Sequence, residues 1–483
     1  MKRQKDRARR RATAGSRSSR EITLPLPLRG LFVEAKSAQV SNLFAAELHN
    51  WRSNGVSLVP RPGVVWQGEP SGVIQRVPYE FGRNPRWIEI TASGASCGAA
   101  EITRLFGGNA MVAEISSNII LADGFGAPVR FNGTEFQEST FSTVTGANPA
   151  RFDGVISHHD RLYFWRSGDA LEFYYGDVGA VGGGLARFPL DRLGNITGSI
   201  AAMVSLTVDA GHGMNDMLCI VTTTGHLVLY EGLDPGDASD WRLTGRVRAA
   251  APIGPLAFAE VGSDAWMMTA QGVVSIGESI RSSVLALVSD ITAPISDEIT
   301  AAVDEGTGVW RMFTSPDGAM VLISRAVGLE ARQWVFYTKS KSWATADLPA
   351  RDWHAFNGKP FITGFDGRLG TIASRDSGEV ITSRWVSSWF EAPGVSGVAY
   401  LVPTIRAQGP LTVRVTLLSD TRDSAADIAE AEQTVTLEPE EDDGGIVTLS
   451  DEIVTDAEGS RFQIIIEVTS AWSELISLKA AVV

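Results

Sequence analysis

The sequence predicts a mainly β protein in which small antiparallel sheets repeat along the chain. Its 483 residues include 49 Gly and 13 Trp, and short β-branched runs between glycines are typical of strands joined by tight turns. The stretch VTTTGHLVLYEG, residues 221–232, shows the unit, because Gly225 separates two runs rich in β-formers as the turn of a hairpin does. Helical periodicity is weak outside two segments, residues 38–51 and 423–433, where we expect helices.

The same pattern of β-prone run, turn glycine and second run recurs along the chain. The candidate turn glycines are Gly63, Gly126, Gly168, Gly225, Gly272, Gly318 and Gly367. Forward from Gly225 the steps are 47, 46 and 49 residues, and backward from it they are 57, 42 and 63. A period in the forties with several strands per unit indicates the blades of a β-propeller, so we predict about seven blades. The alternative is an irregular all-β protein in which glycine turns fall at such intervals by chance.

We expect the chain to divide into four parts. Residues 1–20 form a basic disordered tail, and residues 21–54 form an N-terminal arm whose LPLPL stretch is extended because its prolines exclude a helix. The β-propeller covers residues 55–378, where the alternation of Leu162 and Phe164 is typical of half-buried strands. Residues 379–483 contain two blocks of alternating strands around the acidic stretch LEPEEDDGG, which predicts an additional C-terminal β-sandwich-like module.

Charge is unevenly distributed along the chain. The first 20 residues hold nine Lys or Arg against one Asp, so they carry about +8 and the rest carries about −22 of the total of −14. The tail is either a solvated segment without a dedicated partner or an arm that contacts an acidic neighbouring subunit or nucleic acid. On the second interpretation, Arg9, Arg10 and Arg11 are candidate contact residues. The acidic body argues against a main surface that grips DNA, because it would repel phosphate.

The cysteines and the hydropathy pattern narrow the cellular setting. Cys97 and Cys219 lie far apart and have no spacing typical of metal ligands or of a disulfide framework, which fits a reducing cytoplasm. The sequence has no run of 18 apolar residues and no signal-peptide core, so we expect neither a membrane span nor Sec-type secretion.

Three short motifs raise the question of catalysis or metal binding. GASCG at residues 94–98 has the pattern of a nucleophile elbow around Ser96, but the hairpins downstream do not supply the parallel sheet that such an elbow needs. HHD at His158–Asp160 contains potential metal ligands, yet adjacent residues of a strand point to opposite faces, so a loop or turn role is favoured. The acidic cluster Glu440–Asp443 lacks the alternating spacing of a calcium loop and is expected to be a solvated turn.

The aromatic residues are the last candidates for a binding site. Trp and Tyr side chains can form a platform for sugars, but at strand spacing they are more typical of blade core or of a subunit interface. The sequence has no glycine-rich loop with the lysine that would cradle a phosphate. We therefore predict no catalytic, cofactor-binding or metal-binding residues, no cofactor and no enzymatic activity, which favours a structural or binding role.

Two segments resemble the tail nozzle proteins of short-tailed bacteriophages, also described as tail tubular or DNA-stabilisation hub proteins. In residues 28–64 the resemblance is carried by Leu48, Asn50, Arg61 and Gly63, which lead into an RPG turn. The closer match covers residues 215–282. Its matching positions are Gly225, Tyr230, Gly232, Asp234, Pro235, Trp241, Ile253, Gly254, Thr269, Gly272 and Val273. The long basic tail and the acidic C-terminal insertion depart from the pattern.

The resemblance implies a propeller subunit of a hexameric ring in the virion tail. Such a ring lies below the portal and adaptor rings, contacts the adaptor and other tail proteins, and extends the channel through which double-stranded DNA leaves the particle. It would be made in the cytoplasm of the host bacterium. An acidic lumen suits a conduit because it repels phosphate, and a sixfold ring requires two different contact faces on each copy. We expect this nozzle to conduct the genome during ejection, and it is a candidate gate.

Two other functions remain as alternatives. One is a propeller lectin or receptor-binding tail protein, which would recognise host surface glycan through exposed Trp or Tyr clusters. The other is a propeller hydrolase that acts on a cell-surface glycan. Hexamer formation, glycan binding and loss of activity on Ser96→Ala separate the three.

Overall fold

The computed structural model describes residues 20–33, 41–82, 84–108, 110–143, 152–168, 171–209, 214–282, 291–373, 380–391, 395–420, 428–438 and 446–483. The chain divides into two compact units. Unit 1 contains Met1–Val65, Trp334–Asp347 and Ala373–Val483, and unit 2 contains Trp66–Gln333 and Leu348–Ile372.

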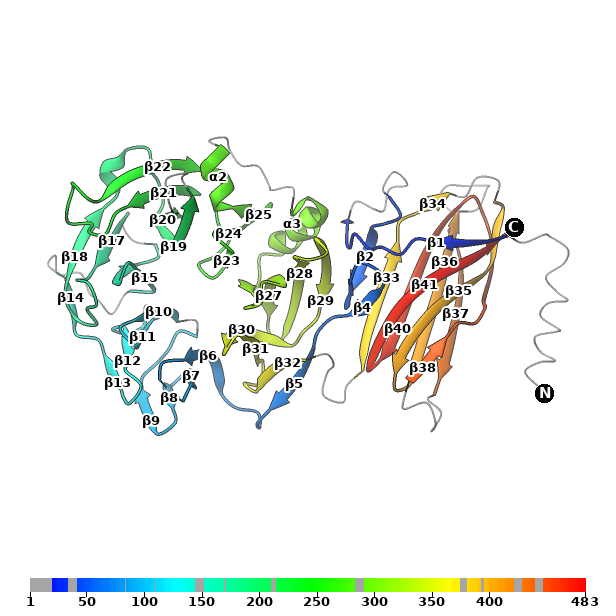
Figure 1. The fold of residues 1–483 in the computed structure, drawn as a ribbon, viewed down its shortest axis with the longest axis horizontal. Coiled ribbons are helices and arrows are strands. Elements are labelled where there is room, and N and C mark those ends of the chain that lie inside the picture. Colours follow the sequence, from blue (N-terminus) through cyan, green and yellow to red (C-terminus); the bar gives the residue numbers. More distant parts are fainter. Residues whose placement is uncertain are drawn as a thin grey trace. The chain divides into compact units, whose positions relative to one another are not determined.

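Unit 2 is built around a β-propeller, which confirms the predicted fold class. Six small sheets, each of three to five described strands, follow one another around a circle (Figure 1). Their strands are β6 (Val73–Tyr79), β7 (Arg86–Thr91), β8 (Gly94–Cys97) and β9 (Ala100–Thr103); β10 (Met111–Ile115), β11 (Asn118–Ala122), β12 (Val129–Phe131) and β13 (Phe136–Glu138); β14 (Phe141–Thr143), β15 (Gly154–His158), β16 (Arg161–Trp165), β17 (Glu172–Tyr175) and β18 (Gly183–Pro189); β19 (Ile200–Asp209), β20 (Met214–Thr222), β21 (His226–Glu231) and β22 (Arg242–Arg248); β23 (Phe258–Val261), β24 (Asp264–Thr269) and β25 (Gly272–Ser275); and β30 (Ala350–Phe356), β31 (Lys359–Gly364), β32 (Leu369–Ala373) and β5 (Gly63–Gln67).

The last of these sheets closes the circle. β5 precedes the first blade in the chain, yet it pairs with β32 of the last blade. Gln67 Nε2 donates a hydrogen bond to Thr371 Oγ1 at 2.6 Å, and Ser71 Oγ donates one to Gly367 O at 2.9 Å. Because this sheet takes strands from both ends of the propeller segment, the ring cannot open without breaking it.

The described chain has six blades where the turn spacing predicted about seven. Two of the predicted turns do not mark a blade. Gly63 begins β5, which pairs with β32, whereas β4 (Leu58–Pro60) pairs with β3 (Trp51–Ser53) and β41 (Trp472–Val482). Gly318 does form a hairpin turn, between β26 (Val309–Thr314) and β27 (Met320–Val327), but those strands belong to a ten-stranded sheet. Conversely, the β6–β9 blade has no turn among the predicted glycines.

The propeller core consists of apolar layers between neighbouring blades. In β16, Leu162 and Phe164 enter the layer shared with the preceding blade, whereas Tyr163 and Trp165 enter the layer shared with the following one. The strand is therefore buried on both faces, unlike the half-buried strand that its alternation predicted, because a blade interior has a neighbour on each side. All four side chains are at most 1% exposed.

Both predicted helices are wrong in the residues that the structure describes. Within residues 38–51 the described part forms β2 (Ala45–His49) and starts β3, and within residues 423–433 it starts β37 (Ile428–Leu437). In β37 exposed and half-buried residues alternate from 430 onward, so the period of two prevails over the weaker helical pattern. The α-helices of the described chain are α2 (Ile276–Ser282) and α3 (Ser296–Asp304), and two short 3₁₀ segments are η3 (Asp191–Leu193) and η4 (Ala293–Ile295).

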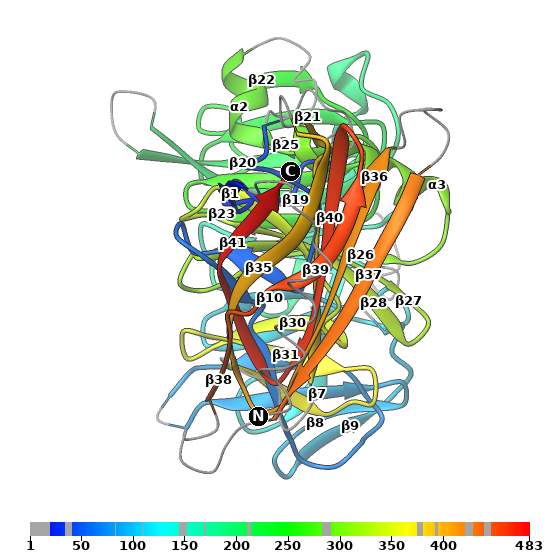
Figure 2. The same cartoon turned by 90° about the vertical axis from the view of Figure 1, so that its right-hand side faces the viewer.

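Unit 1 combines long C-terminal strands with strands from near the N-terminus (Figure 2). A seven-stranded sheet contains β1 (Arg20–Leu24), β3, β4, β35 (Gly397–Gln408), β38 (Ile446–Leu449), β39 (Ile453–Glu458) and β41. The ten-stranded sheet includes β2, β28 (Glu330–Tyr337), β29 (Ser342–Ala346), β33 (Ile381–Ser387), β34 (Phe390–Glu391), β36 (Leu411–Asp420), β37 and β40 (Arg461–Ser470). Part of the segment predicted as an arm is thus strand β1, whose Arg20 lies opposite Val482 of β41.

Candidate functional site

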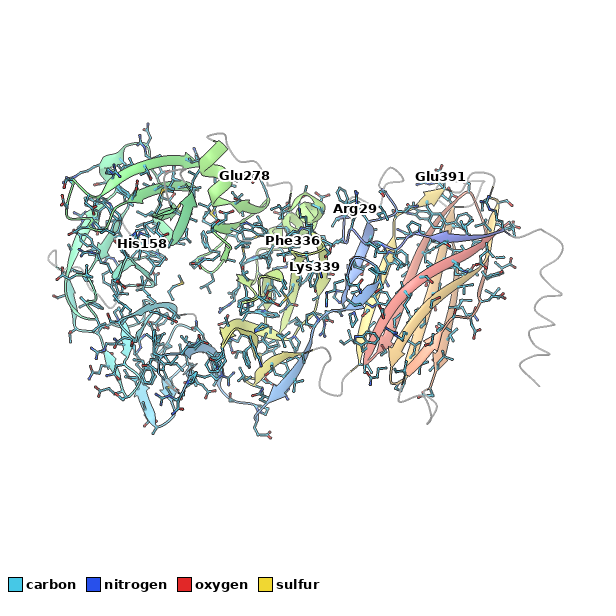
Figure 3. All side chains as sticks on the ribbon, viewed as in Figure 1. Arg29, His158, Glu278, Phe336, Lys339 and Glu391 are labelled. Carbon is cyan, nitrogen blue, oxygen red and sulfur yellow. The ribbon has the colours of Figure 1, made fainter. Side chains whose placement is uncertain are left out.

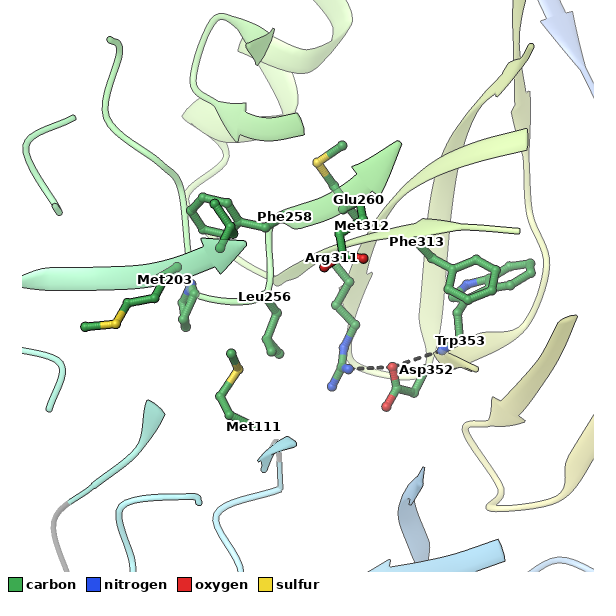
Figure 4. Close-up of a pocket in the computed structure, with 14 residues that line it drawn as sticks. Met111, Met203, Leu256, Phe258, Glu260, Arg311, Met312, Phe313, Asp352 and Trp353 are labelled. Atoms are coloured by element: carbon green, nitrogen blue, oxygen red, sulfur yellow. Dashed lines mark hydrogen bonds and ion pairs between the residues drawn. The ribbon is translucent and has the colours of Figure 1, made fainter. Parts of the chain in front are cut away.

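A cavity of about 270 Å³ lies within unit 2, where the first strands of several sheets approach one another (Figure 4). Its lining comes from β10, β19, β23, β26 and β30 and from the segment that precedes β23. The lining residues are Met111, Ala202, Met203, Val204, Pro255, Leu256, Phe258, Ala259, Glu260, Arg311, Met312, Phe313, Asp352 and Trp353. This central cavity is mostly apolar and has a few polar groups, as ligand sites usually do, so it is the first candidate site.

Most of the cavity wall is apolar and adaptable. Met111, Met203 and Met312 come from three different sheets, and Leu256 and Phe258 lie beside them (Figure 4). Methionine side chains are flexible and polarisable, so they fill irregular space between blades without a single fixed geometry. A sphere of this volume is roughly 8 Å across, whereas the major groove of B-DNA is already about 12 Å wide and the duplex that contains it is wider. A DNA duplex therefore does not fit into this cavity.

One side of the cavity carries a buried ion pair. Arg311 Nη1 lies 2.5 Å from Asp352 Oδ1, and the two side chains are 11% and 8% exposed. Asp352 Oδ1 also accepts a hydrogen bond from the backbone N–H of Trp353 at 2.9 Å. Burial, together with the Arg311 charge, lowers the pKa of the nearby Arg351. Because the carboxylate is already paired and hydrogen-bonded, the pair is suited to joining β26 to β30 and less to acid–base chemistry.

Further polar contacts next to this pair connect the closing blade to the first one. His354 Nε2 lies 2.8 Å from Thr363 Oγ1, and burial, opposed by Asp352 and assisted by Arg311 and Arg76, lowers the pKa of His354 to about 4. Arg76 pairs with Glu89 at 2.8 Å and donates to Gly367 O at 2.9 Å. The buried cation thus links β6 and β7 to the β31–β32 turn, and His354 stays neutral near pH 7.

Ser96 is not placed for catalysis as a nucleophile elbow. It lies inside β8, where it is opposite Glu89 of β7 and Glu101 of β9. An elbow requires a sharp turn from a strand into a helix, and here an antiparallel ladder continues on both sides. The neighbouring Cys97 is buried, and desolvation raises the pKa of its thiol.

The HHD motif forms a turn, as the favoured interpretation predicted. His159 and Asp160 have φ angles of +48° and +55° and connect β15 to β16, with His158 paired opposite Arg161. Two successive residues with positive φ are the signature of a type I′ hairpin turn. His158 lies among the side chains of its blade (Figure 3), and its Nδ1 is 2.9 Å from Ser205 Oγ of the next blade. Burial and His159 lower the pKa of His158 to about 4.

Two other predicted features cannot be placed. Arg9, Arg10 and Arg11, and the acidic cluster Glu440–Asp443, lie outside the described residues. Within the residues that the structure describes, His, Cys, Asp and Glu side chains form no group of three that could hold a metal ion. In the same residues no helix is long and apolar enough to span a membrane.

The segment that carries the closer resemblance, residues 215–282, contains strands β20–β22 of one blade, the three strands β23–β25 of the next blade, and helix α2. Its turn glycine, Gly225, has a φ of +85°, and an added Cβ would lie 2.3 Å from Ala249 O. Gly232 has a φ of +129° and is just as tightly packed, with Asp240 O at 2.4 Å from an added Cβ. These glycines are required because the backbone of another segment occupies the space of a side chain.

The aromatic positions of the same motif stack on each other. The rings of Tyr230 and Trp241 lie 5.1 Å apart at 11°, and both side chains are buried in the layer between two blades. The loop between them is closed by Asp240, whose Oδ2 accepts hydrogen bonds from Leu233 N and Asp234 N at 2.6 and 2.9 Å. These aromatic residues therefore belong to the blade core and offer no exposed platform for a sugar.

Sequence reasoning missed the residues of the central cavity. Met111, Met203 and Met312 share no motif and no common step along the chain, and Arg311 and Asp352 are 41 residues apart. A complete assignment of the strands would have indicated them, because each lies in the first strand of its sheet.

The comparisons with known proteins assign no family and no function. No protein-family model and no curated protein matches the chain. The β-propeller domain of Swd1 from Myceliophteria thermophila has a TM-score of 0.41 and 11% identity, over 64% of this chain and 98% of that one. BBS1N, solved with ARL6DN, has a TM-score of 0.40 and 9% identity over 65% and 97%. The WD40 β-propeller domain of Doa1 has 0.36 and 8% over 64% and 95%.

Proposed function

We propose that this chain is a structural protein of a bacteriophage tail, a subunit of the ring-shaped nozzle below the portal and adaptor that conducts genomic DNA during ejection. The observation that carries the proposal is the resemblance of residues 215–282. These residues form three of the four strands of one sheet, β20–β22 without the first residue of β20, all three strands β23–β25 of the next sheet, and α2. The matched glycines and aromatic residues make packing contacts within this segment. The resemblance therefore concerns a folded segment and not isolated sequence positions.

The proposal does not place the DNA channel inside a single propeller. A duplex does not fit into a cavity of about 270 Å³ inside one propeller. In the proposed nozzle the conduit is therefore the hole between copies arranged in a ring, and the propellers form its wall. The net charge of −14 supports this arrangement, because an acidic wall repels phosphate and lets the duplex slide through without binding.

Partners follow from the same proposal. The chain would form a hexamer, contact the adaptor and other tail proteins, and be localised in the virion tail after synthesis in the bacterial cytoplasm. The basic tail with Arg9, Arg10 and Arg11 is the candidate clamp onto an acidic adaptor surface.

The test is the location of the protein in purified particles. Electron microscopy of virions, with the chain carrying an added epitope and a gold-labelled antibody, should place label on a ring in the tail below the portal. Particles assembled without the protein should fail to deliver DNA although their heads are filled. Absence of the chain from intact particles overturns the proposal, and specific binding of the purified protein on a glycan array would then favour the lectin alternative.

A further inference from the structure

Two of the strands that end the sheets of the described chain, β22 and β37, have features that suit them to pairing with each other. β22 is the last strand of the order β19-β20-β21-β22, and β37 is the last strand of the order β40-β36-β37. In the described residues neither has a second strand on its outer side. Exposed edges offer backbone N–H and C=O groups to another chain, and proteins usually protect them with charge or cover them with a partner.

The two edges carry opposite charges at the same spacing. β22 exposes Arg246 and Arg248, two residues apart, while Val247 between them packs toward the core with α2. β37 exposes Glu430 and Glu432, also two residues apart. Residues i and i+2 of a strand share one face, so each edge presents a pair of like charges on one side.

We propose that β22 of one copy pairs with β37 of a second copy and that Glu432 and Glu430 then lie opposite Arg246 and Arg248. The proposal rests on the ring-shaped assembly proposed above and names its contact. The edges are two different surfaces, as a ring requires, because each copy offers β22 to one neighbour and β37 to the other. Cross-strand pairs of opposite charge stabilise such a ladder, and like charges opposite each other destabilise it.

Existing contacts leave these side chains available. Arg246 Nη1 donates to Leu193 O at 2.5 Å and remains exposed, and Glu432 Oε2 accepts a hydrogen bond from Thr416 Oγ1 at 3.5 Å. Arg242, the third arginine of β22, lies 3.4 Å from Glu231 within its own sheet and is not needed. Arg246 and Arg248 therefore carry the contact on the basic side.

A second copy fits the basic edge better than DNA does. Copies with a net charge of −14 repel one another, so association requires a surface where the sign is locally reversed. β22 supplies that reversal, and β37 of the same chain supplies the matching acidic pair. Two arginines on the edge of an acidic body give little attraction for a duplex, because affinity for DNA rises with the number of phosphates neutralised.

Charge reversal tests the pairing without depending on a single variant. The basic-edge variant is Arg246→Glu with Arg248→Glu, and the acidic-edge variant is Glu430→Arg with Glu432→Arg. Sedimentation velocity of the full chain should show wild-type rings and at least a tenfold loss of assembly for each variant alone. An equimolar mixture should assemble again, because contacts in an alternating ring join two reversed edges and two unchanged edges in turn, and both kinds of contact pair opposite charges. The chain with all four substitutions should also assemble.

The matched control is Lys339→Glu with Lys341→Glu. These exposed lysines are likewise two residues apart, Lys339 is labelled in Figure 3, and the substitutions change the net charge as much as the basic-edge variant does. The control should assemble like the wild type. Near-ultraviolet circular dichroism checks that every variant is folded.

Three results overturn the proposed pairing. They are a wild-type chain that stays monomeric in solution, variants that assemble like the wild type, and a folded mixture that does not recover. A basic-edge variant that assembles normally but loses retention on immobilised duplex DNA would assign β22 to DNA instead. None of these results concerns the presence of the chain in virions, so failure of the pairing is distinguishable from failure of the nozzle proposal.

Discussion

Replacement of one turn glycine tests the packing of the blades directly. Gly225 connects β20 to β21 with a φ of +85°, and an added Cβ would lie 2.3 Å from Ala249 O and 2.9 Å from the carbonyl carbon of Ala250. Both contacts are backbone atoms, so a flexible side chain cannot move aside. Gly225→Ala therefore forces the turn away from the segment that follows β22.

The magnitude follows from two contributions. A left-handed backbone costs an alanine roughly 1–2 kcal/mol, and displacement of a packed segment costs about 1–3 kcal/mol more. Gly358→Ala is the matched control, because Gly358 also lies in a hairpin turn at a φ of +68° but has nothing within 4 Å of an added Cβ. It should cost only the backbone contribution of roughly 1–2 kcal/mol. Alanine restricts the unfolded chain equally in both variants, so that effect cancels in the comparison.

The assay is urea unfolding followed by tryptophan fluorescence, with midpoints compared at equal slopes. We expect Gly225→Ala to lower the free energy of unfolding by about 1–3 kcal/mol more than Gly358→Ala does. Equal losses for the two variants would refute the close approach of Gly225 to Ala249, and with it the packing described for this blade.

Three further predictions concern buried and terminal charges. Because the pKa of His354 is about 4 in the folded chain and about 6.5 when unfolded, the unfolded state binds more protons between these values. The resulting stabilisation, up to about 3 kcal/mol, is complete above pH 6.5 and is lost as the pH falls toward 4. His354→Gln should therefore reduce the change in the free energy of unfolding between pH 6.5 and pH 4. Asp352→Ala should cost about 3–5 kcal/mol because it leaves Arg311 buried without its carboxylate, whereas Asp352→Leu combined with Arg311→Met should cost less in the same urea titration. Replacement of Arg9, Arg10 and Arg11 by Ser should reduce incorporation into virions, measured by immunoblot of purified particles, and full incorporation would exclude the clamp.

The sequence predicted local turns well and distant pairings poorly. Gly225 and Gly367 were found because a tight turn with positive φ favours glycine, and this requirement is visible in a few residues. The pairing of β5 with β32 and of β1 with β41 joins segments hundreds of residues apart, and no local pattern encodes it. The blade predicted at Gly318 is wrong for the same reason. The sequence of a hairpin is similar whether its sheet has four strands or continues into a larger sheet.

The candidate site was even less accessible to sequence reasoning. A cavity at the centre of a propeller takes one or a few residues from each of several sheets, and Met111 and Trp353 are brought together only by the circular order of the blades. The motifs that did attract attention, at Ser96 and at His158–Asp160, proved to be a ladder position and a hairpin turn. Short motifs of this kind depend on their structural context, which an antiparallel array does not supply.

The acidity of the chain has two opposing effects in the proposed nozzle. It keeps the wall of the conduit from binding phosphate, but it also makes neighbouring copies repel each other. A less negative surface overall would weaken the repulsion between copies and favour assembly. It would also let the wall bind phosphate and so hinder the passage of DNA. A local pair of positive charges on one strand edge, with Arg246 and Arg248 covered by Glu432 and Glu430 of the next copy, avoids this conflict. Once the pairs have formed, the arginines are neutralised inside the contact, and the wall that the duplex meets remains acidic.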